Sequence, residues 1–215
     1  VKPKWLLTEG TRINQTKGST ELQVKKKISR LIKNSKGLVF IEHPIRDMDR
    51  VKTVYDASKE NNRVFVVNLK LAYLINALGE LAPFKLSDVK ILIPPKSWGL
   101  IHKENIDPCL IDADYSEWER SFIKMPNAIK SSELVANPSH YVVCMNMFEI
   151  GNLIDIKPSN AIWIKSSCEP FCEEMEIDEE IKVNWLKHFK IKHYHAHASG
   201  HAPGPEIRRL VKTIN

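Results

Sequence analysis

Short apolar runs alternate with amphipathic segments through most of the chain. The runs have the length of buried strands, and we predict strands at residues 38–41, 63–67, 89–93, 141–145 and 161–164. An apolar run without polar alternation is typical of a strand that is covered on both faces. The pattern therefore predicts an α/β fold built on a doubly wound, mainly parallel sheet.

Amphipathic helices are predicted between these strands. Thr20 and Gln23 have the spacing of a capping box, and apolar residues then recur at helical intervals. The next helix is predicted to end near residue 61, and Asp47 or Asp49 can cap its start. Further helices are predicted over residues 70–81, 114–123, 181–189 and 205–213. The acidic stretch 173–180 is expected only to lead into its helix, where negative charge complements the helix dipole.

Each end of the chain contributes one further predicted strand. Residues 4–8 are expected to form a short buried strand that runs into the polar turn 9–12. Residues 191–197 are expected to form the last strand. Because α/β proteins place their chemistry at the carboxyl ends of strands, the polar residues that follow these two strands are candidates for a functional site.

Composition narrows the class of protein. A length of 215 residues is enough for one large domain or two small ones, and 32 basic against 26 acidic residues give a net charge of +6. This charge is compatible with a nucleic-acid partner. No apolar run approaches the ~20 residues of a membrane helix. The four cysteines lack CxxC spacing, so we expect buried, reduced thiols in a cytoplasmic protein.

Half of the eight histidines fall within residues 193–201. Imidazole titrates near neutral pH, so this cluster suits proton transfer, metal binding or phosphate binding. Zinc ligation by His195, His197 and His201 is one interpretation, but such a site needs a fourth ligand that the spacing does not supply. For His193 and His195 we prefer ordinary strand positions on a half-polar face.

A turn at Ser199 and Gly200 places His201 just before a predicted helix. A hydroxyl, exposed N–H groups and an imidazole at a helix N-terminus can bind a phosphate. Glu9 follows the other terminal strand. If the two strands are neighbours, its carboxylate can hold His201 in one tautomer and favour the protonated ring as a proton donor. An exposed loop carboxylate is the alternative interpretation of Glu9.

The stretch 197–202, His-Ala-Ser-Gly-His-Ala, resembles the HxSGHA signature of the β-CASP group of metallo-β-lactamase-fold nucleases. The RNase J type and the endonuclease that cuts messenger-RNA precursors at their 3′ ends are members of that group. Residues 6–11 resemble the strand-plus-acid motif that opens the β-CASP insertion. Residues 163–167, followed by Glu173 and Glu174, resemble the strand that leads back. The resemblance covers essentially the whole chain, and only HxSGHA is specific.

The resemblance implies a β-CASP sheet with flanking strands from a metallo-β-lactamase αββα domain. It divides the chain into a metallo-β-lactamase segment at residues 1–16, a β-CASP domain at 17–185 and a second metallo-β-lactamase segment at 186–215. It also implies a zinc-dependent ribonuclease that hydrolyses RNA phosphodiester bonds. In such an enzyme His201 would protonate the leaving oxygen, and Glu9 would orient His201.

The same resemblance implies a phosphate-binding set for RNA. Its members would be His197, Ser199 and Gly200, with Ser166 or Ser167 at the same pocket. Independently of the resemblance, a second nucleotide contact is expected in a loop after a strand. Lys96 and Trp98 there interleave a basic and an aromatic side chain, which can stack a base; anchoring of that loop on the core is an equal interpretation.

Two groups of basic residues have weaker signals. Arg46 and Arg50 follow a strand end and could contact phosphate, although capping or solvent exposure is the preferred interpretation. A basic helix face could follow an RNA backbone, although it is more simply a solvated side. Its members are Lys25, Lys26, Lys27, Arg30 and Lys33.

The zinc motif HxHxDH of the family is absent, and His195-Ala196-His197 matches only its first half. We therefore expect the ligands of the two zinc ions, and most of the metallo-β-lactamase half, to lie outside this chain. The chain alone would be inactive, supplying RNA binding and the general-acid side of the site. RNA and the missing metallo-β-lactamase half are its expected partners, while the sequence leaves DNA as a substrate and a homodimer open, and no membrane partner is expected. A non-catalytic RNA- or nucleotide-binding α/β module is the alternative.

Overall fold

A computed structural model describes residues 4–214 and has an α/β architecture. Within this range seven strands form one all-parallel sheet in the order β4-β3-β2-β5-β1-β6-β7. The strands are β1 Val39–Glu42, β2 Val64–Val67, β3 Lys90–Leu92, β4 Ala128–Ile129, β5 Tyr141–Cys144, β6 Ile162–Lys165 and β7 Lys192–His195. The predicted α/β fold with a parallel sheet is confirmed.

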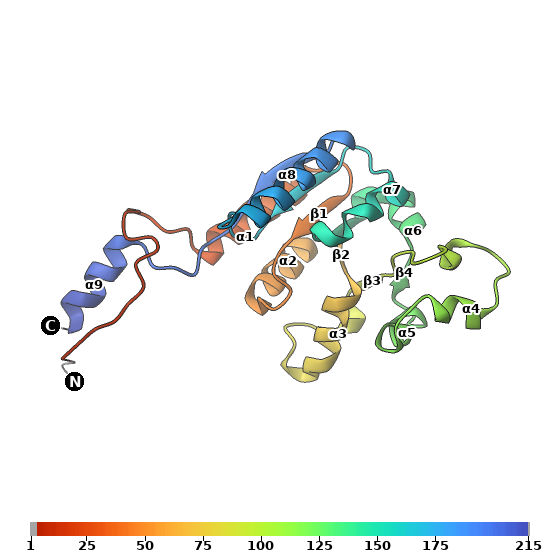
Figure 1. Cartoon of the computed structure of the whole chain (residues 1–215), viewed down its shortest axis with the longest axis horizontal. Helices are drawn as coiled ribbons and strands as arrows, with labels where there is room; N and C mark the ends of the chain where they lie inside the picture. Colours follow the sequence, from red (N-terminus) through yellow and green to blue (C-terminus); the bar gives the residue numbers. More distant parts are fainter. Residues whose placement is uncertain (1–3, 215) are drawn as a thin grey trace.

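Helices cover both faces of the sheet. The helices are α1 Glu21–Asn34, α2 Met48–Glu60, α3 Leu69–Leu78, α4 Pro108–Ala113, α5 Glu117–Ile123, α6 Ser131–Ala136, α7 Leu153–Ile156, α8 Glu173–His188 and α9 Gly204–Ile214. Buried side chains of α1, α2, α3 and α5 form one core, and those of α6, α7 and α8 form the other. Most of these helices are visible in Figure 1.

Alternation along the strands divides the apolar residues between the two cores. In β1, Val39 and Ile41 face the core that contains α1 and α2, whereas Phe40 faces the opposite core. In β6, Ile164 and Trp163 divide in the same way, because successive strand side chains point to opposite faces. Both faces are buried, which explains why the strands have no polar alternation.

The strand order creates a switch point next to β1. The chain passes from β1 to β2 on one side, and β5 lies between those two strands. After β5 the chain crosses to β6, on the other side of β1. Ligands of doubly wound proteins bind outside the carboxyl ends of the strands at such a switch point. This rule directs attention to the ends of β1, β5 and β6.

The two terminal segments lie beside each other at one end of the molecule (Figure 1). Arg12 forms an isolated parallel bridge with Pro203, and the Gly204 N–H donates to the Gln15 carbonyl at 3.1 Å. The side-chain position of Gly204 is filled by the Ile13 carbonyl, so a side chain there would overlap the backbone. The chain ends are thus joined by backbone contacts.

Several sequence predictions need correction. The predicted strand at residues 4–8 is wrong: these residues are extended coil, with Trp5 82% and Leu7 97% exposed, because no strand of the described chain pairs with them. The acidic stretch is itself the first half of α8. The four cysteines are free, but only Cys144 is buried, so the expected burial of the other three is wrong.

The predicted end of the β-CASP domain at residue 185 falls inside α8, which continues to His188. β7, from the third predicted segment, pairs with β6 in the central sheet. Among residues 4–214, the helices are all too short or too polar to cross a bilayer.

Candidate functional site

The structure places Glu9 and His201 in contact. The distance from His201 Nδ1 to Glu9 Oε2 is 3.4 Å, and the Ala202 N–H donates to Glu9 Oε1 at 2.8 Å. The Thr11 N–H donates to Glu9 Oε2 at 2.9 Å. The hydrogen bond from Ala202 is the main reason that the pKa of Glu9 is lowered. The carboxylate therefore stays ionised beside the imidazole.

The HxSGHA stretch forms an exposed turn between β7 and α9. Ser199 Oγ accepts a hydrogen bond of 3.2 Å from the His201 N–H, and Gly200 is exposed with open space around it. The Ala202 N–H is already bound to Glu9. Gly200 and His201 are the most exposed residues of the turn, and His197 and Ser199 are partly exposed.

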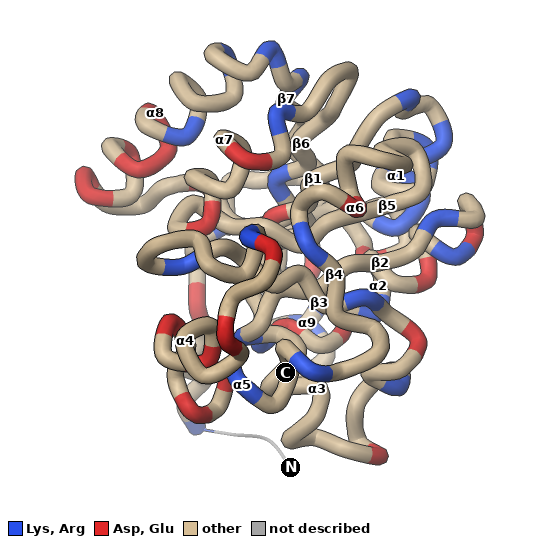
Figure 2. Tube along the Cα trace, turned by 90° about the vertical axis from the view of Figure 1, so that its right-hand side faces the viewer, with Lys and Arg blue, Asp and Glu red and all other residues tan. Residues whose placement is uncertain are grey.

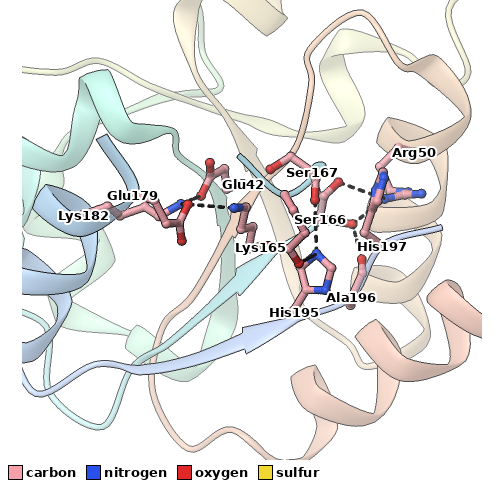
Figure 3. Close-up of polar contacts among 11 residues, drawn as sticks. Glu42, Arg50, Lys165, Ser166, Ser167, Glu179, Lys182, His195, Ala196 and His197 are labelled. Atoms are coloured by element: carbon pink, nitrogen blue, oxygen red, sulfur yellow. Dashed lines mark hydrogen bonds and ion pairs between the residues drawn. The ribbon is translucent and has the colours of Figure 1, made fainter. Parts of the chain in front are cut away.

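The side chain of Arg50 contacts both Ser166, at the end of β6, and His197, just after β7. Its side chain is only 2% exposed, and its Nε and Nη2 donate to the two carboxylate oxygens of Glu21, each at 2.8 Å. Its Nη1 donates to the Ser166 carbonyl at 2.9 Å and to Ser166 Oγ at 2.6 Å, and lies 3.2 Å from His197 Nδ1. Figure 3 shows Arg50 beside Ser166 and His197. The expectation of an exposed or capping Arg50 is wrong.

The two candidate serines have different surroundings. Ser166 is fully buried, and its hydroxyl donates to the Ala196 carbonyl at 2.6 Å while it accepts from Arg50. Ser166 thus holds the strand ends together and has no surface for a phosphate. Ser167 is half-buried, and its carbonyl oxygen lies 3.2 Å from His195 Nε2 (Figure 3). Because a carbonyl oxygen can only accept a hydrogen bond, His195 Nε2 is the donor and carries a proton.

Arg50 and burial set the electrostatics of this cluster. The pKa of His197 is lowered, first by burial and then by the charge of Arg50. The pKa of Glu21 is also lowered, chiefly by its hydrogen bonds from Arg50. The arrangement therefore favours a neutral His197 beside an ion pair.

A second polar cluster lies at the carboxyl ends of β1 and β6. Lys182 is 2% exposed, and its Nζ lies 2.7 Å from both Glu42 Oε2 and Glu179 Oε2. Lys165 Nζ lies 2.7 Å from the same Glu179 oxygen, and Trp163 Nε1 donates to Glu42 Oε2 at 3.1 Å. Figure 3 shows the four charged side chains converging. Burial opposes ionisation of Glu179, but the two lysines outweigh it and lower its pKa.

A pocket of about 380 Å³ opens beside this cluster, at the switch point. Glu42, His43, Lys70, Lys165 and Ser167 are among its lining residues. His43 is buried, and its Nε2 has no hydrogen-bond partner. Burial lowers the pKa of His43 to about 4.

Lys96 and Trp98 are not brought to the histidines. They follow β3, which is five inter-strand steps from β7, or about 24 Å at the usual strand spacing. Lys96 Nζ is held by Glu119 at 2.6 Å, and Trp98 is 81% exposed. Trp98 therefore does not anchor its loop on the core.

The basic face of α1 is partly neutralised. Lys25 Nζ lies 2.8 Å from Glu60 and 3.6 Å from Asp56, both on α2. Figure 2 shows basic residues along α1 and acidic residues on the first half of α8. The first turn of α8 is acidic, and its last turn contains Lys187 and His188. Charges placed in this way interact favourably with the helix dipole and stabilise the helix.

The described residues do not fit a complete zinc centre. Between Lys4 and Ile214, no three His, Cys, Asp or Glu side chains are grouped closely enough to hold a metal ion. The rings of His195 and His197 are 6.1 Å apart between centroids. A zinc site built from these histidines and His201 alone is therefore not formed.

Sequence reasoning missed the structural roles of Arg50, Lys165 and Lys182. A usable signal exists for the two helical residues: Arg50 precedes the buried Val54 by one helical turn, and Lys182 precedes the buried Leu186 by the same interval. A charged residue on an apolar helix stripe must be paired when it is buried.

Comparison with protein-family models and with curated proteins finds no match to this chain. The resemblance to the β-CASP nucleases therefore rests on the sequence motifs, and the contacts described above provide the structural context for them.

Proposed function

We propose that this chain is the RNA-binding and proton-donating part of a zinc-dependent metallo-β-lactamase/β-CASP ribonuclease. The observation that carries the proposal is the contact between Glu9 and the second histidine of HxSGHA, His201, from opposite ends of the chain. The zinc ligands would lie outside the described residues. The free cysteines support a cytoplasmic location for such an enzyme.

The proposed reaction step of this chain is proton donation. The Glu9 carboxylate stabilises a protonated His201 through Nδ1, and leaves Nε2 to face the substrate. As the bond between phosphorus and the leaving oxygen breaks, the proton on Nε2 passes to that oxygen. Glu9 keeps its charge throughout, because its pKa is lowered mainly by the Ala202 N–H.

RNA binding is proposed along the same edge of the molecule. His197 and Ser199 precede His201 on the turn, and the Gly200 backbone is exposed beside them. These groups can donate to phosphate oxygens. The net charge of +6 supports an attraction to the RNA backbone.

The test joins this chain to a metallo-β-lactamase segment that carries HxHxDH and supplies it with zinc. Cleavage of a labelled RNA is then measured for His201→Ala and Glu9→Gln. We expect His201→Ala to lower kcat by about 10²- to 10⁴-fold, the usual contribution of a general acid, and Glu9→Gln to cause a smaller loss.

His140→Ala is the matched control, because His140 is exposed and lies just before β5, at the amino ends of the strands, whereas the HxSGHA stretch follows the carboxyl end of β7. Full activity of His201→Ala would overturn the assignment. RNA binding without cleavage, with or without zinc, would instead favour the non-catalytic RNA-binding module.

A further inference from the structure

We propose that Arg50 is a positioning residue that fixes the tautomer of His197, so that this ring presents a neutral Nε2–H donor to a phosphate. The identity of that phosphate as part of RNA rests on the proposed function. The tautomer itself does not, because it follows from contacts within the chain.

The direction of the hydrogen bond sets the tautomer. A guanidinium group has only donors, so the His197 Nδ1 that lies 3.2 Å from Arg50 Nη1 must accept. A neutral imidazole that accepts at Nδ1 carries its proton at Nε2. Protonation of Nδ1 would turn its N–H toward another N–H group, which the contact disfavours.

Arg50 is held too firmly to adapt to the other tautomer. Glu21 binds its Nε and Nη2 together in a bidentate pair. The two N–H groups of Nη1 face three acceptors, Ser166 O, Ser166 Oγ and His197 Nδ1, so that two of these acceptors share one N–H group. The three residues come from α1, α2 and the end of β6. The fork geometry of a bidentate Arg–carboxylate pair fixes the plane of the guanidinium, so Arg50 presents a fixed donor to His197.

The other groups around His197 do not reverse this preference. The charge of Arg50 on α2 and that of His195 at the end of β7 both oppose a charged His197. The Ser166 backbone and Asp47, the N-cap of α2, act in the opposite direction, but they are outweighed by burial and by the charge of Arg50, so the pKa of His197 is lowered. Glu21 on α1 is neutralised by the same guanidinium.

The two histidines of HxSGHA would therefore have different chemistry. His201 lies against a carboxylate and can carry a proton to be transferred. His197 lies against a guanidinium and donates from a neutral ring. Its hydrogen bond to a phosphate would persist as the pH rises above neutrality, where a protonated imidazole would lose its extra proton.

The experiment reads the ring nitrogens of His197 by ¹⁵N–¹H NMR in the isotopically labelled chain, without RNA. The expected spectrum shows a protonated Nε2 and an unprotonated Nδ1. In Arg50→Met the two tautomers should mix and the titration midpoint of His197 should rise. Because this variant leaves Glu21 unpaired, the double variant Arg50→Met with Glu21→Gln is measured beside it.

Arg46→Met is the control, since it removes the same charge from an exposed position in the turn just before α2, the helix that carries Arg50. A protonated Nδ1 in the unmodified chain, or an unchanged tautomer in the folded Arg50 variants, would overturn the proposal.

A short single-stranded RNA is titrated separately. The double variant should bind it between about threefold and tenfold more weakly, as expected when one hydrogen bond is lost. RNA affinity unchanged in a variant whose tautomers mix would overturn the phosphate contact of His197. If the expected tautomer is found but the unmodified chain does not bind RNA, the proposed function fails while the assignment of Arg50 stands.

Discussion

Histidine side chains of this protein differ according to the group that each one touches. His201 faces a carboxylate, His197 faces a guanidinium, and His43 is buried with one nitrogen unpaired. Burial lowers the pKa of His43 and, together with the charge of Arg50, that of His197. Residues of one type therefore have different electrostatic surroundings in this protein.

His43 should make stability depend on pH. Burial lowers its folded-state pKa from 6.5 to about 4, so the unfolded chain binds more protons between those values. Stability is expected to rise with pH through this window, by up to about 1.4 kcal/mol per pH unit, and to keep the full gain above it. Urea unfolding across the window should show a flatter dependence for His43→Phe.

The effect of His43 is the difference in the pH dependence of stability between the unmodified chain and His43→Phe. This difference is needed because carboxylates titrate in the same pH range and affect both proteins. His140→Phe, at an exposed position, should retain the slope of the unmodified chain. Equal slopes for the unmodified chain and His43→Phe would contradict a neutral buried His43.

At the residue scale, the sequence predicted Glu9 and His201 as partners but not the surroundings of Ser166 or Arg50. The motif positions were recognisable because their order is specific. The helical periodicity of α2 places Arg50 on the buried side of that helix, but its partners Glu21 and Ser166 depend on how α1, α2 and the end of β6 pack.

At the element scale, the first turn of α1 bears directly on the candidate site. Thr20 Oγ1 accepts from the Gln23 N–H at 3.3 Å, and the Gln23 side chain accepts from the Thr20 N–H at 3.0 Å. Glu21, which binds Arg50, is the first residue of this helix. The cap therefore helps to hold the carboxylate that orients Arg50.

Thr20→Ala should lower the free energy of unfolding by about 1 kcal/mol, because a helix N-terminal donor loses its acceptor. Urea denaturation measures the loss, and Ser19→Ala is the neighbouring control. The same NMR measurement of His197 should show a partial shift in the Thr20→Ala variant. A loss as large in Ser19→Ala would show that the cap is not the cause.

Element prediction succeeded where a run was long enough to show its period. β1, β2, β5 and β6 are four-residue strands that overlap the predicted apolar runs, and α1 has its capping box. The two-residue β4 and the six-residue helices α4 and α6 are too short for periodicity to reveal. The error at residues 4–8 has another cause, since an apolar run becomes a strand only where a partner strand exists.

At the scale of the whole molecule, close backbone packing holds the two terminal segments together. Gly204→Ala would place a methyl group on the Ile13 carbonyl and separate them. We expect faster limited proteolysis of residues 4–19 and 196–214 and loss of the contact between Glu9 and His201. The melting temperature should change little, because the sheet core is remote from this contact.

Gly151→Ala is the control, since a side chain there would meet no atom within 4 Å. Unchanged proteolysis in Gly204→Ala would show that the terminal segments do not depend on this close approach.

The position of β1 between β5 and β6 has a consequence for biosynthesis. Both neighbours of β1 are made late: Val39 pairs with Val142 and with Ile162, and the first of these follows it by roughly a hundred residues. As the chain leaves the ribosome, this apolar strand has two open edges and cannot be completed by β2, which is made next. Pairings between residues so far apart in the sequence make folding slow. The protein most needs a chaperone during the period of synthesis before β5 and β6 have been made.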